Sequence, residues 1–317
     1  MLSRTTRRAS RRSFLSAAGA LAATGLALAG CGSDSLSGGA SSTATSSASG
    51  SASPTASTSA DPALTAMLPQ SVRDSGVLRV GTNAEYAPNE FLEGDTVKGM
   101  DIDVMDAVAA KLGVRAEYSN AGFDTLLTGV TGNRYDVAIS SFTINAERLG
   151  QVNMVQYFNA GTQWVVAKGN PEGVDPENAC GKTVAVQSAT TQSDDDLPAR
   201  IQACTDAGQP AIEVLAFDSQ EDATTAVVQG RAVAMLADSP IAAYAVQQTG
   251  DALELAGEIY DAAPYGIVVP KEQAQEAEAI SQALQQLADE GAYTAALATW
   301  GAEDGAVTEF PVNPALS

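Results

Sequence analysis

Short apolar runs rich in valine, isoleucine and leucine alternate with longer amphipathic stretches through most of the chain after residue 75. The short runs predict buried strands, and the longer stretches, with apolar residues three or four positions apart, predict helices. Strands that alternate with helices favour an α/β fold whose parallel sheets carry helices on both faces. The predicted strands are 77–81, 115–119, 135–139, 162–167, 183–186, 212–216, 232–237 and 267–269, and the predicted helices are 101–112, 123–131, 220–229, 273–289 and 292–299.

Segment 134–148, RYDVAISSFTINAER, carries the clearest chemical pattern in the chain. A predicted strand ends there in hydroxyl side chains, and an arginine follows. In open α/β sheets ligands bind at the carboxyl ends of strands, and hydroxyls, backbone N–H groups and a guanidinium suit a small carboxylate. The alternative is a serine-rich turn before a helix near Asn145 with a surface arginine. The candidate residues are Ser140, Ser141, Thr143 and Arg148.

Residues 1–30 have the pattern of a twin-arginine secretory signal. Arg11 and Arg12 precede Ser-Phe-Leu, and an apolar stretch of small residues ends in Leu-Ala-Gly just before Cys31. A charged start, a short apolar middle and a small-residue site predict export, and the apolar run is too short for a permanent span. The Leu-Ala-Gly-Cys sequence resembles a lipobox, which implies cleavage before Cys31 and a lipid on its thiol. An uncleaved anchor is the alternative.

Residues 31–68 are mostly serine, alanine, threonine and glycine, with few large apolar side chains. Such a segment has no apolar face to bury, so it is predicted to be a disordered tether. The composition changes at residue 69 to that of a folded body, which is long enough for two lobes of ordinary size.

Composition excludes several classes of function. The 317-residue chain has 17 basic and 38 acidic residues, a net charge of −21 that disfavours nucleic-acid binding. It has no histidine, which removes Ser-His-Asp and Cys-His catalysis and imidazole zinc sites, so neither a metal nor a cofactor is expected. In an oxidising compartment, Cys180 and Cys204 predict a disulfide worth about 3 kcal/mol, with two free thiols as the alternative.

Six segments in this order resemble the family 3 extracellular solute-binding proteins, the amino-acid receptors of ABC importers. The resemblance covers about residues 75–302. It implies a two-lobed, type II periplasmic-binding fold in which each lobe is a mainly parallel sheet flanked by helices, with the ligand cleft between the lobes. Lobe 1 would comprise 69–163 and 266–317, and lobe 2 would comprise 164–265. The segments are GTNAEYAP at 81–88, GMDID at 99–103, FDTLL at 123–127, the segment 134–148, VAVQSATT at 184–191 and AMLAD at 234–238.

The resemblance also implies how an amino acid would be held. Arg148 would bind the α-carboxylate, assisted by Thr143 and by the backbone N–H of Thr190 or Thr191. Asp238 would bind the α-ammonium, with the Ser141 carbonyl as a second acceptor. The remaining implied ligand contacts are Tyr86 and Phe123, whose rings would flank the ligand side chain, Ser140 through its backbone, and Asn83.

Elementary electrostatics supports the same pair of charged residues. A zwitterion needs one cation and one anion opposite its two charges, and charge-assisted hydrogen bonds of this kind contribute roughly 1.5–3 kcal/mol each. The alternatives are that Asp238 caps a helix beginning near Pro240 and that Tyr86 and Phe123 are core rings.

The nature of the ligand side chain is less well determined by the sequence. Asn83 stands where family receptors for basic amino acids often carry an acid. This favours a polar, uncharged side chain over arginine or lysine, unless Glu85 or Glu90 supplies the acid.

These features together predict a monomeric, non-enzymatic receptor, tethered by the lipid on Cys31 to the outer face of the cytoplasmic membrane. It would deliver a free amino acid to a membrane permease. The alternatives are an enzyme on the same scaffold, such as a cyclohexadienyl-type dehydratase, and a ligand sensor that does not take part in transport. An enzyme would need a general acid or base over its substrate.

Overall fold

The computed structural model describes residues 59–316. The predicted signal, Cys31 and the tether residues up to 58 lie outside the described residues. The body contains an eight-stranded sheet in the order β5-β1-β6-β11-β7-β10-β8-β9 and a small sheet in the order β2-β3-β4. The strands are β1 Val77–Thr82, β2 Glu85–Tyr86, β3 Glu90–Glu93, β4 Thr96–Lys98, β5 Arg115–Asn120, β6 Val137–Ala138, β7 Val152–Ala167, β8 Thr183–Gln187, β9 Glu213–Phe217, β10 Ala234–Asp238 and β11 Leu253–Pro270.

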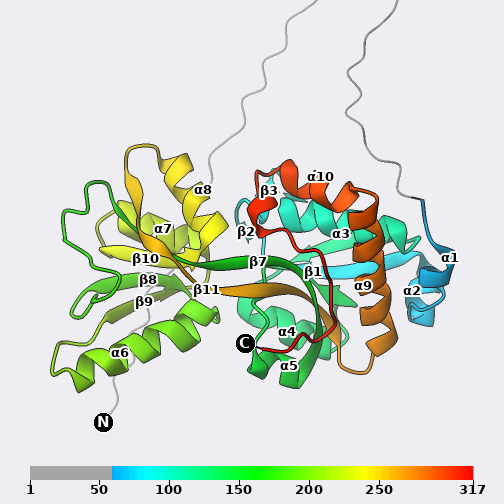
Figure 1. Ribbon diagram of the computed structural model, residues 1–317, viewed down its shortest axis with the longest axis horizontal. Coiled ribbons are helices and arrows are strands. Elements are labelled where there is room, and N and C mark those ends of the chain that lie inside the picture. Colours follow the sequence, from blue (N-terminus) through cyan, green and yellow to red (C-terminus); the bar gives the residue numbers. More distant parts are fainter. Residues whose placement is uncertain (1–58, 317) are drawn as a thin grey trace, which may run out of the picture. The chain divides into compact units, whose positions relative to one another are not determined.

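Helices flank the large sheet, which confirms the predicted α/β class (Figure 1). Within residues 59–316 no helix is long and apolar enough to cross a membrane. The α-helices are α1 Pro62–Thr65, α2 Gln70–Ser75, α3 Met100–Lys111, α4 Phe123–Thr131, α5 Ala146–Gln151, α6 Leu197–Asp206, α7 Gln220–Val228, α8 Ser239–Thr249, α9 Ala274–Asp289 and α10 Ala292–Ala298; η1 Gln192–Asp196 is π-helical and η2 Glu303–Gly305 is a 3₁₀ turn.

Strand directions divide the large sheet into two mainly parallel halves. β5, β1 and β6 are parallel to one another at one end, and β10, β8 and β9 are parallel at the other. β11 is antiparallel to β6 and β7, and β7 is antiparallel to β10. We call the half around β1 lobe 1 and the half around β8 lobe 2.

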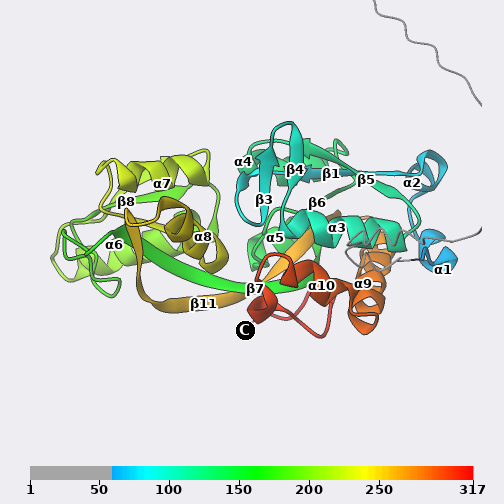
Figure 2. The same ribbon diagram turned by 90° about the horizontal axis from the view of Figure 1, so that it is seen from above.

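The long strands β7 and β11 connect the two lobes. They are paired with each other along most of their length, with register shifts between residues 256 and 266. Figures 1 and 2 both show this pair running from the helices around α3 and α9 to those around α7 and α8. The pattern predicted only the short segments 162–167 and 267–269 of these strands, because strongly twisted, partly exposed stretches such as 253–263 do not show clear apolar runs.

Each lobe has its own apolar core. In lobe 1, α3 and α9 pack on the sheet through side chains such as Val104, Val108 and Leu284. In lobe 2, α7 and α8 cover one face through Ala226 and Ile241, and α6 covers the other. Helix α6 was not predicted, and α8 corresponds to the helix near Pro240 that entered only in the alternative for Asp238.

The predicted tether ends earlier than residue 68. Asp61 caps α1 by accepting a hydrogen bond from the Ala63 N–H, and Leu64 and Leu68 are buried in the lobe 1 core. The prediction that residues 61–68 are disordered was therefore wrong: the two leucines supply enough apolar contact to dock the segment despite its small-residue composition.

The predicted strand 135–139 is also shorter in the structure. Only Val137–Ala138 is a strand. Tyr135 instead buries its ring against Gly81 and Gly129, where a Cβ atom would lie 2.6 Å and 2.4 Å from ring carbons. Glycine is therefore required at both positions to leave room for this ring.

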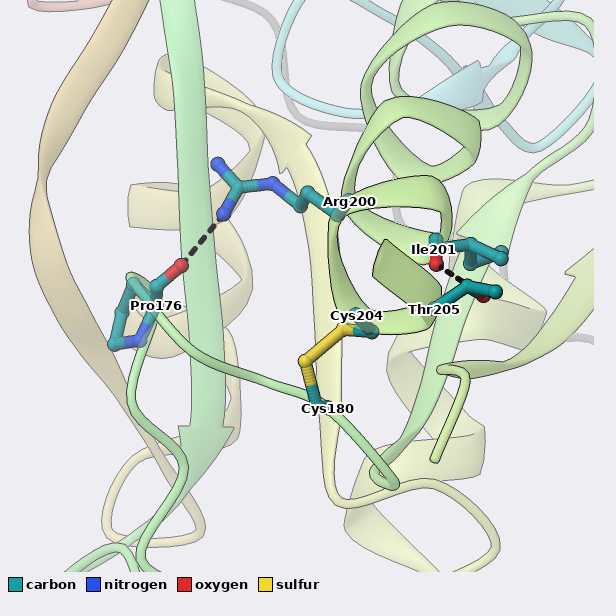
Figure 3. Close-up of a disulfide and its surroundings, with 6 residues drawn as sticks. All are labelled: Pro176, Cys180, Arg200, Ile201, Cys204 and Thr205. Carbon is teal, nitrogen blue, oxygen red and sulfur yellow. Dashed lines mark hydrogen bonds between the residues drawn. A yellow bond between two sulfur atoms is a disulfide. The ribbon is translucent and has the colours of Figure 1, made fainter. Parts of the chain in front are cut away.

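Lobe 2 contains a disulfide between Cys180 and Cys204, which joins the loop before β8 to α6. Figure 3 shows the bond beside Arg200, whose guanidinium donates to the Pro176 carbonyl at 2.6 Å. The same arginine bonds Asp196 and lies over the Trp164 ring. The disulfide at Cys204 and the hydrogen bonds of Arg200 thus attach α6 to the rest of the lobe at two separate points.

We expect Glu276 to make the stability of lobe 1 depend on pH. This carboxyl at the start of α9 is buried, and burial together with the nearby Asp136 raises its pKa from 4.5 to about 8. The folded state keeps a proton that the unfolded state loses above about pH 4.5, so stability falls as pH rises toward 8. Between these pH values the free energy of unfolding, measured with denaturant, should fall less in Glu276→Gln than in wild type, by up to about 5 kcal/mol. The exposed Glu278→Gln serves as control, and the same pH dependence in both variants would contradict the assignment.

Candidate ligand-binding site

The structure brings nine of the ten predicted ligand-binding residues into one pocket. The pocket lies where strands of both lobes end, and its walls close around a cavity of about 10 Å³. A cavity of this volume holds about one water molecule, so the lobes must part to admit a larger solute. The pocket's predicted residues are Tyr86, Phe123, Ser140, Ser141, Thr143 and Arg148 from lobe 1, and Thr190, Thr191 and Asp238 from lobe 2.

Arg148 is a buried cation with no anion beside it. Its side chain is 8% exposed, and its guanidinium donates to the carbonyls of Thr143 at 2.7 Å and Ala189 at 3.1 Å. Among residues 59–316 no carboxylate lies within ion-pair distance of it. Burial lowers the pKa of this guanidinium, and the field of Asp238 opposes the shift. A buried charge without a counter-ion is costly, so the site suits an anion.

Helix α5 and two aromatic rings position Arg148. Asn145 caps the helix by accepting a hydrogen bond from the Arg148 N–H at 2.9 Å. The helix near Asn145 is therefore present as the alternative expected, but its arginine is buried and not on the surface. The guanidinium carbon lies 5.6 Å from the ring centroid of Phe123 and 5.4 Å from that of Phe142, and the two rings are stacked. Cation–π contacts of this kind hold the guanidinium in place.

Asp238 is a buried anion held by neutral donors. Its Oδ2 accepts hydrogen bonds from the hydroxyls of Tyr86 at 2.9 Å and Tyr265 at 2.7 Å, and its Oδ1 accepts one from Gln192 Nε2 at 2.8 Å. Burial raises the pKa of this carboxyl, and the three hydrogen bonds counteract the shift. Asp238 precedes α8 but makes no side-chain capping bond, so the capping alternative was wrong.

The turn after β8 presents backbone donors to the pocket. Thr190 donates its hydroxyl to the Gln187 carbonyl, so the side chain is committed to the turn itself. Thr191 and Gln192 begin the helical segment that continues into α6, and the first N–H groups of a helix have no partner within it. Ala189 adopts a φ of +62°, which places its carbonyl on Arg148.

Tyr86 connects the lobes through its ring and its hydroxyl. It lies on β2 of lobe 1, yet its ring packs with Met235 and Ala237 of lobe 2, and its hydroxyl contacts Asp238. The ring therefore belongs to the lobe 2 core and also forms a pocket wall.

Asn83 does not line the pocket, contrary to the prediction. Its Nδ2 donates to the Ala121 carbonyl at 3.1 Å, and its Oδ1 accepts from Gln187 Nε2 at 2.9 Å. The amide is buried and both of its ends are occupied, so its contact is between the lobes. Gln187 lines the pocket in its place.

Two polar residues at the site, Gln192 and Tyr265, were not predicted, whereas Gln187 was expected near the pocket floor. Gln187 and Gln192 line the pocket, and Tyr265 reaches Asp238 from β11. The run Gln-Ser-Ala-Thr-Thr-Gln at 187–192 offered a signal for both glutamines, because polar residues crowd the end of a strand there. Tyr265 gave none, since it reads as an ordinary strand residue.

A second hollow borders the pocket and shares Phe123, Arg148, Thr190 and Thr191 with it. This hollow forms the mouth of the pocket, and four carboxylates line it, two from each lobe. In the described part of the chain no group of three or more His, Cys, Asp or Glu side chains is arranged to hold a metal ion. The field of the four carboxylates disfavours anionic solutes and favours cationic ones. They are Asp124, Glu147, Asp194 and Asp195.

Comparisons with known proteins agree with this architecture. Residues 78–303 match the family model of bacterial extracellular solute-binding proteins, family 3. The chain is 35% identical over 253 residues to the arginine-binding protein ArgT of Corynebacterium glutamicum, covering 80% of this chain and 83% of that protein. It is 29% identical over 230 residues to a probable ABC transporter arginine-binding protein, ArtJ, of Chlamydia trachomatis, covering 70% and 84%.

Among solved structures, an ancestral arginine-binding protein bound to arginine superposes with a TM-score of 0.66 at 33% identity, covering 71% of this chain and 98% of that one. The family model spans most of the chain, from the first strand of the large sheet to the turn after α10. The chain belongs to the family 3 bacterial extracellular solute-binding proteins.

Proposed function

We propose that this protein is the solute-binding component of an ABC importer and binds a free amino acid between its lobes. The observation that carries the proposal is the pair of opposite buried charges in one small pocket, Arg148 and Asp238, neither of which has an ionic partner among the described residues. We call this pair the amino-acid clamp. A zwitterion supplies the missing anion and cation from a single carbon atom.

The surrounding groups complete the two halves of the clamp. Arg148 binds the α-carboxylate through its remaining N–H donors, and the backbone N–H groups at Thr191 and Thr143 add neutral donors. Asp238 binds the α-ammonium, with the Ser141 carbonyl as second acceptor. Tyr86 and Phe123 lie beside the ligand as flat walls. Two charge-assisted bonds with these additions are sufficient for the roughly 8 kcal/mol of a micromolar complex.

Because the clamp draws on both lobes, the ligand stabilises their closed arrangement. Arg148 is in lobe 1 and Asp238 is in lobe 2, so both contacts exist only when the lobes meet. A ligand with such differential contacts shifts the population toward the closed form, which a permease then recognises.

The ligand side chain is neutral and polar or cationic, and not anionic. Asn83, now placed outside the pocket, no longer argues against a basic amino acid, and the four carboxylates at the mouth favour one. Relatives named as arginine-binding proteins make arginine the first ligand to test.

The protein acts outside the cytoplasm as a monomer. Export through the twin-arginine signal, cleavage before Cys31 and a lipid on that cysteine would attach it to the outer face of the cytoplasmic membrane.

A thermal-shift screen against the twenty amino acids tests the proposed function. A ligand at a hundred times its dissociation constant stabilises the folded state by about 2.7 kcal/mol, which is readily measured. We expect arginine or a neutral polar amino acid such as glutamine to raise the melting temperature most, and glutamate and aspartate to have no effect. A screen in which no amino acid stabilises the protein would contradict the proposal.

A turnover assay distinguishes the proposed receptor from the enzyme alternative. The pocket's only carboxylate, Asp238, accepts three hydrogen bonds and faces the α-ammonium in the proposed complex, so no other acid is placed for general acid–base catalysis. We expect purified protein not to convert prephenate or arogenate, and turnover of either would favour the dehydratase.

A further inference from the structure

Two fully buried carboxyl groups lie behind the pocket and do not line it. Glu90 is on β3 and Asp101 is in the first turn of α3, and both are 0% exposed. No lysine or arginine of the described chain lies within ion-pair distance of either group. Such a pair of acids is expensive to bury unless something holds it there.

Glu90 holds the strand end that forms the floor of the pocket. Its Oε1 accepts the Ser140 hydroxyl at 2.8 Å, and that hydroxyl in turn accepts the Asn83 N–H at 3.0 Å. Its Oε2 accepts the Ser141 hydroxyl at 3.3 Å. Glu90 therefore acts on both serines that follow β6.

Asp101 holds the backbone of the same segment. Its Oδ2 accepts the Ser141 N–H at 2.8 Å and the Tyr157 hydroxyl at 2.7 Å. Its Oδ1 is buried and accepts no hydrogen bond from an amide or hydroxyl donor in the described chain. Both carboxyls contact the Ser141 hydroxyl, each at 3.3 Å, so two acids lie side by side with no cation, an arrangement that favours one proton between them.

The segment they hold is strained. Ser141 has a φ of +51°, a left-handed conformation that is unfavourable for residues other than glycine. Such conformations persist where the surroundings over-determine them. Here Glu90, Asp101 and the Asn89 amide, which donates to the Ser141 hydroxyl at 2.8 Å, supply that constraint.

The charge state of the pair follows from burial. Desolvation raises the pKa of Glu90 well above its usual range, with the neighbouring Asp101 adding to the shift, and raises that of Asp101 to about 6. The titratable groups facing the pair are the hydroxyls of Tyr86 on β2, Tyr118 on β5 and Tyr157 on β7, which burial keeps neutral. Burial and the mutual repulsion of the two carboxyls therefore favour a pair that keeps one proton.

We infer that Glu90 is a positioning residue for the amino-acid clamp, which it serves through Ser140 and Ser141, and that the clamp is intact only while Glu90 and Asp101 share a proton. This inference rests on the proposed function. Loss of the shared proton places two negative charges behind the serines, so the carboxyls repel each other and the strained turn relaxes. The Ser141 carbonyl and the neighbouring Thr143 then lose their alignment with the ligand.

The test compares the pH dependence of l-arginine binding in wild type and Glu90→Gln. Glutamine keeps an acceptor for the Ser140 hydroxyl and imitates the protonated acid. We expect Glu90→Gln to bind within about threefold of wild type at about pH 7, whereas raising the pH to about 9.5 should weaken wild type by about tenfold more than the variant. The ligand loses its own ammonium proton equally in both, so the difference isolates Glu90.

Two further variants complete the calorimetric experiment. Glu90→Ala removes both acceptors and should weaken binding by about tenfold or more at both pH values. Glu93→Gln, an exposed acid on the same strand, removes the same charge and should follow the wild-type profile.

Parallel pH profiles for wild type and Glu90→Gln, with wild type binding l-arginine, would overturn the inference and leave the proposed function standing. If wild type binds l-arginine with no loss at high pH beyond that of the variant, the shared proton has no role. If wild type binds no amino acid at all, the proposed function fails, and with it any role of Glu90 in the clamp.

Discussion

Arg148→Ala is expected to weaken amino-acid binding by at least about thirtyfold, the equivalent of roughly 2–5 kcal/mol. Removing the guanidinium leaves the ligand carboxylate buried without its cation. Only the neutral N–H groups of Thr143 and of the turn after β8 remain to hold it. Isothermal titration calorimetry of both proteins with the amino acid that stabilises wild type most measures the effect directly.

Two further substitutions serve as comparisons for Arg148→Ala. Arg148→Lys keeps the charge but loses the planar fork that binds a carboxylate through two hydrogen bonds, so we expect an intermediate loss. Arg134→Ala removes an exposed arginine that lies over the Tyr135 ring outside the pocket and should leave affinity unchanged. Near-native affinity in Arg148→Ala would remove Arg148 from the clamp.

Asp238→Asn is expected to weaken binding by about tenfold or more, since it removes the anion that faces the α-ammonium. The substitution also disturbs the site itself, because three donors converge on this carboxylate and an amide nitrogen adds a fourth. One of the hydroxyls of Tyr86 and Tyr265 or the Gln192 amide must then turn away. Because Tyr86 comes from lobe 1, the variant should also hold the lobes together less firmly.

The matched control for Asp238 is Asp194→Asn, an exposed acid at the mouth of the pocket. It removes the same charge nearby without touching the clamp, so its effect should be limited to a small, salt-dependent loss for a cationic ligand. Equal losses in the two variants would mean that Asp238 acts only through the general field and not by contact with the ammonium.

The predictable parts of the site are those encoded within one segment. Ser140, Ser141, Thr143 and Arg148 follow a single strand, so their approach to one another depends on local geometry alone. Asp238 was found in the same way, at the end of an apolar strand. In the structure Thr190 and Thr191, which come from the other lobe and were included through the family resemblance, line the same pocket.

The unpredicted parts depend on contacts between distant segments. Tyr265 reaches Asp238 because β11 is long enough to cross between the lobes, and the apolar pattern revealed only its last residues. Gln192 reaches it because a π-helical turn precedes α6. Asn83 does not line the pocket because its side-chain amide is hydrogen-bonded to the Ala121 carbonyl and to the Gln187 side chain. None of these partners could be identified from spacing along the chain.

The edge of the folded body was mispredicted for a related reason. Composition identified 31–68 as a tether, but two leucines at its end dock on lobe 1 and cannot be recognised as core residues without their partners on α9 and α3. A few apolar side chains in a polar segment are common in both tethers and docked termini, so their role depends on the surface they meet.

The most direct test of the central claim is calorimetry of wild type with three related ligands: the preferred amino acid, the same molecule without its α-carboxylate, and the same molecule without its α-amino group. The clamp predicts that each truncated ligand binds at least about tenfold more weakly than the parent, because each leaves either Arg148 or Asp238 without its ionic partner. Binding of either truncated ligand as tightly as the parent would contradict the account.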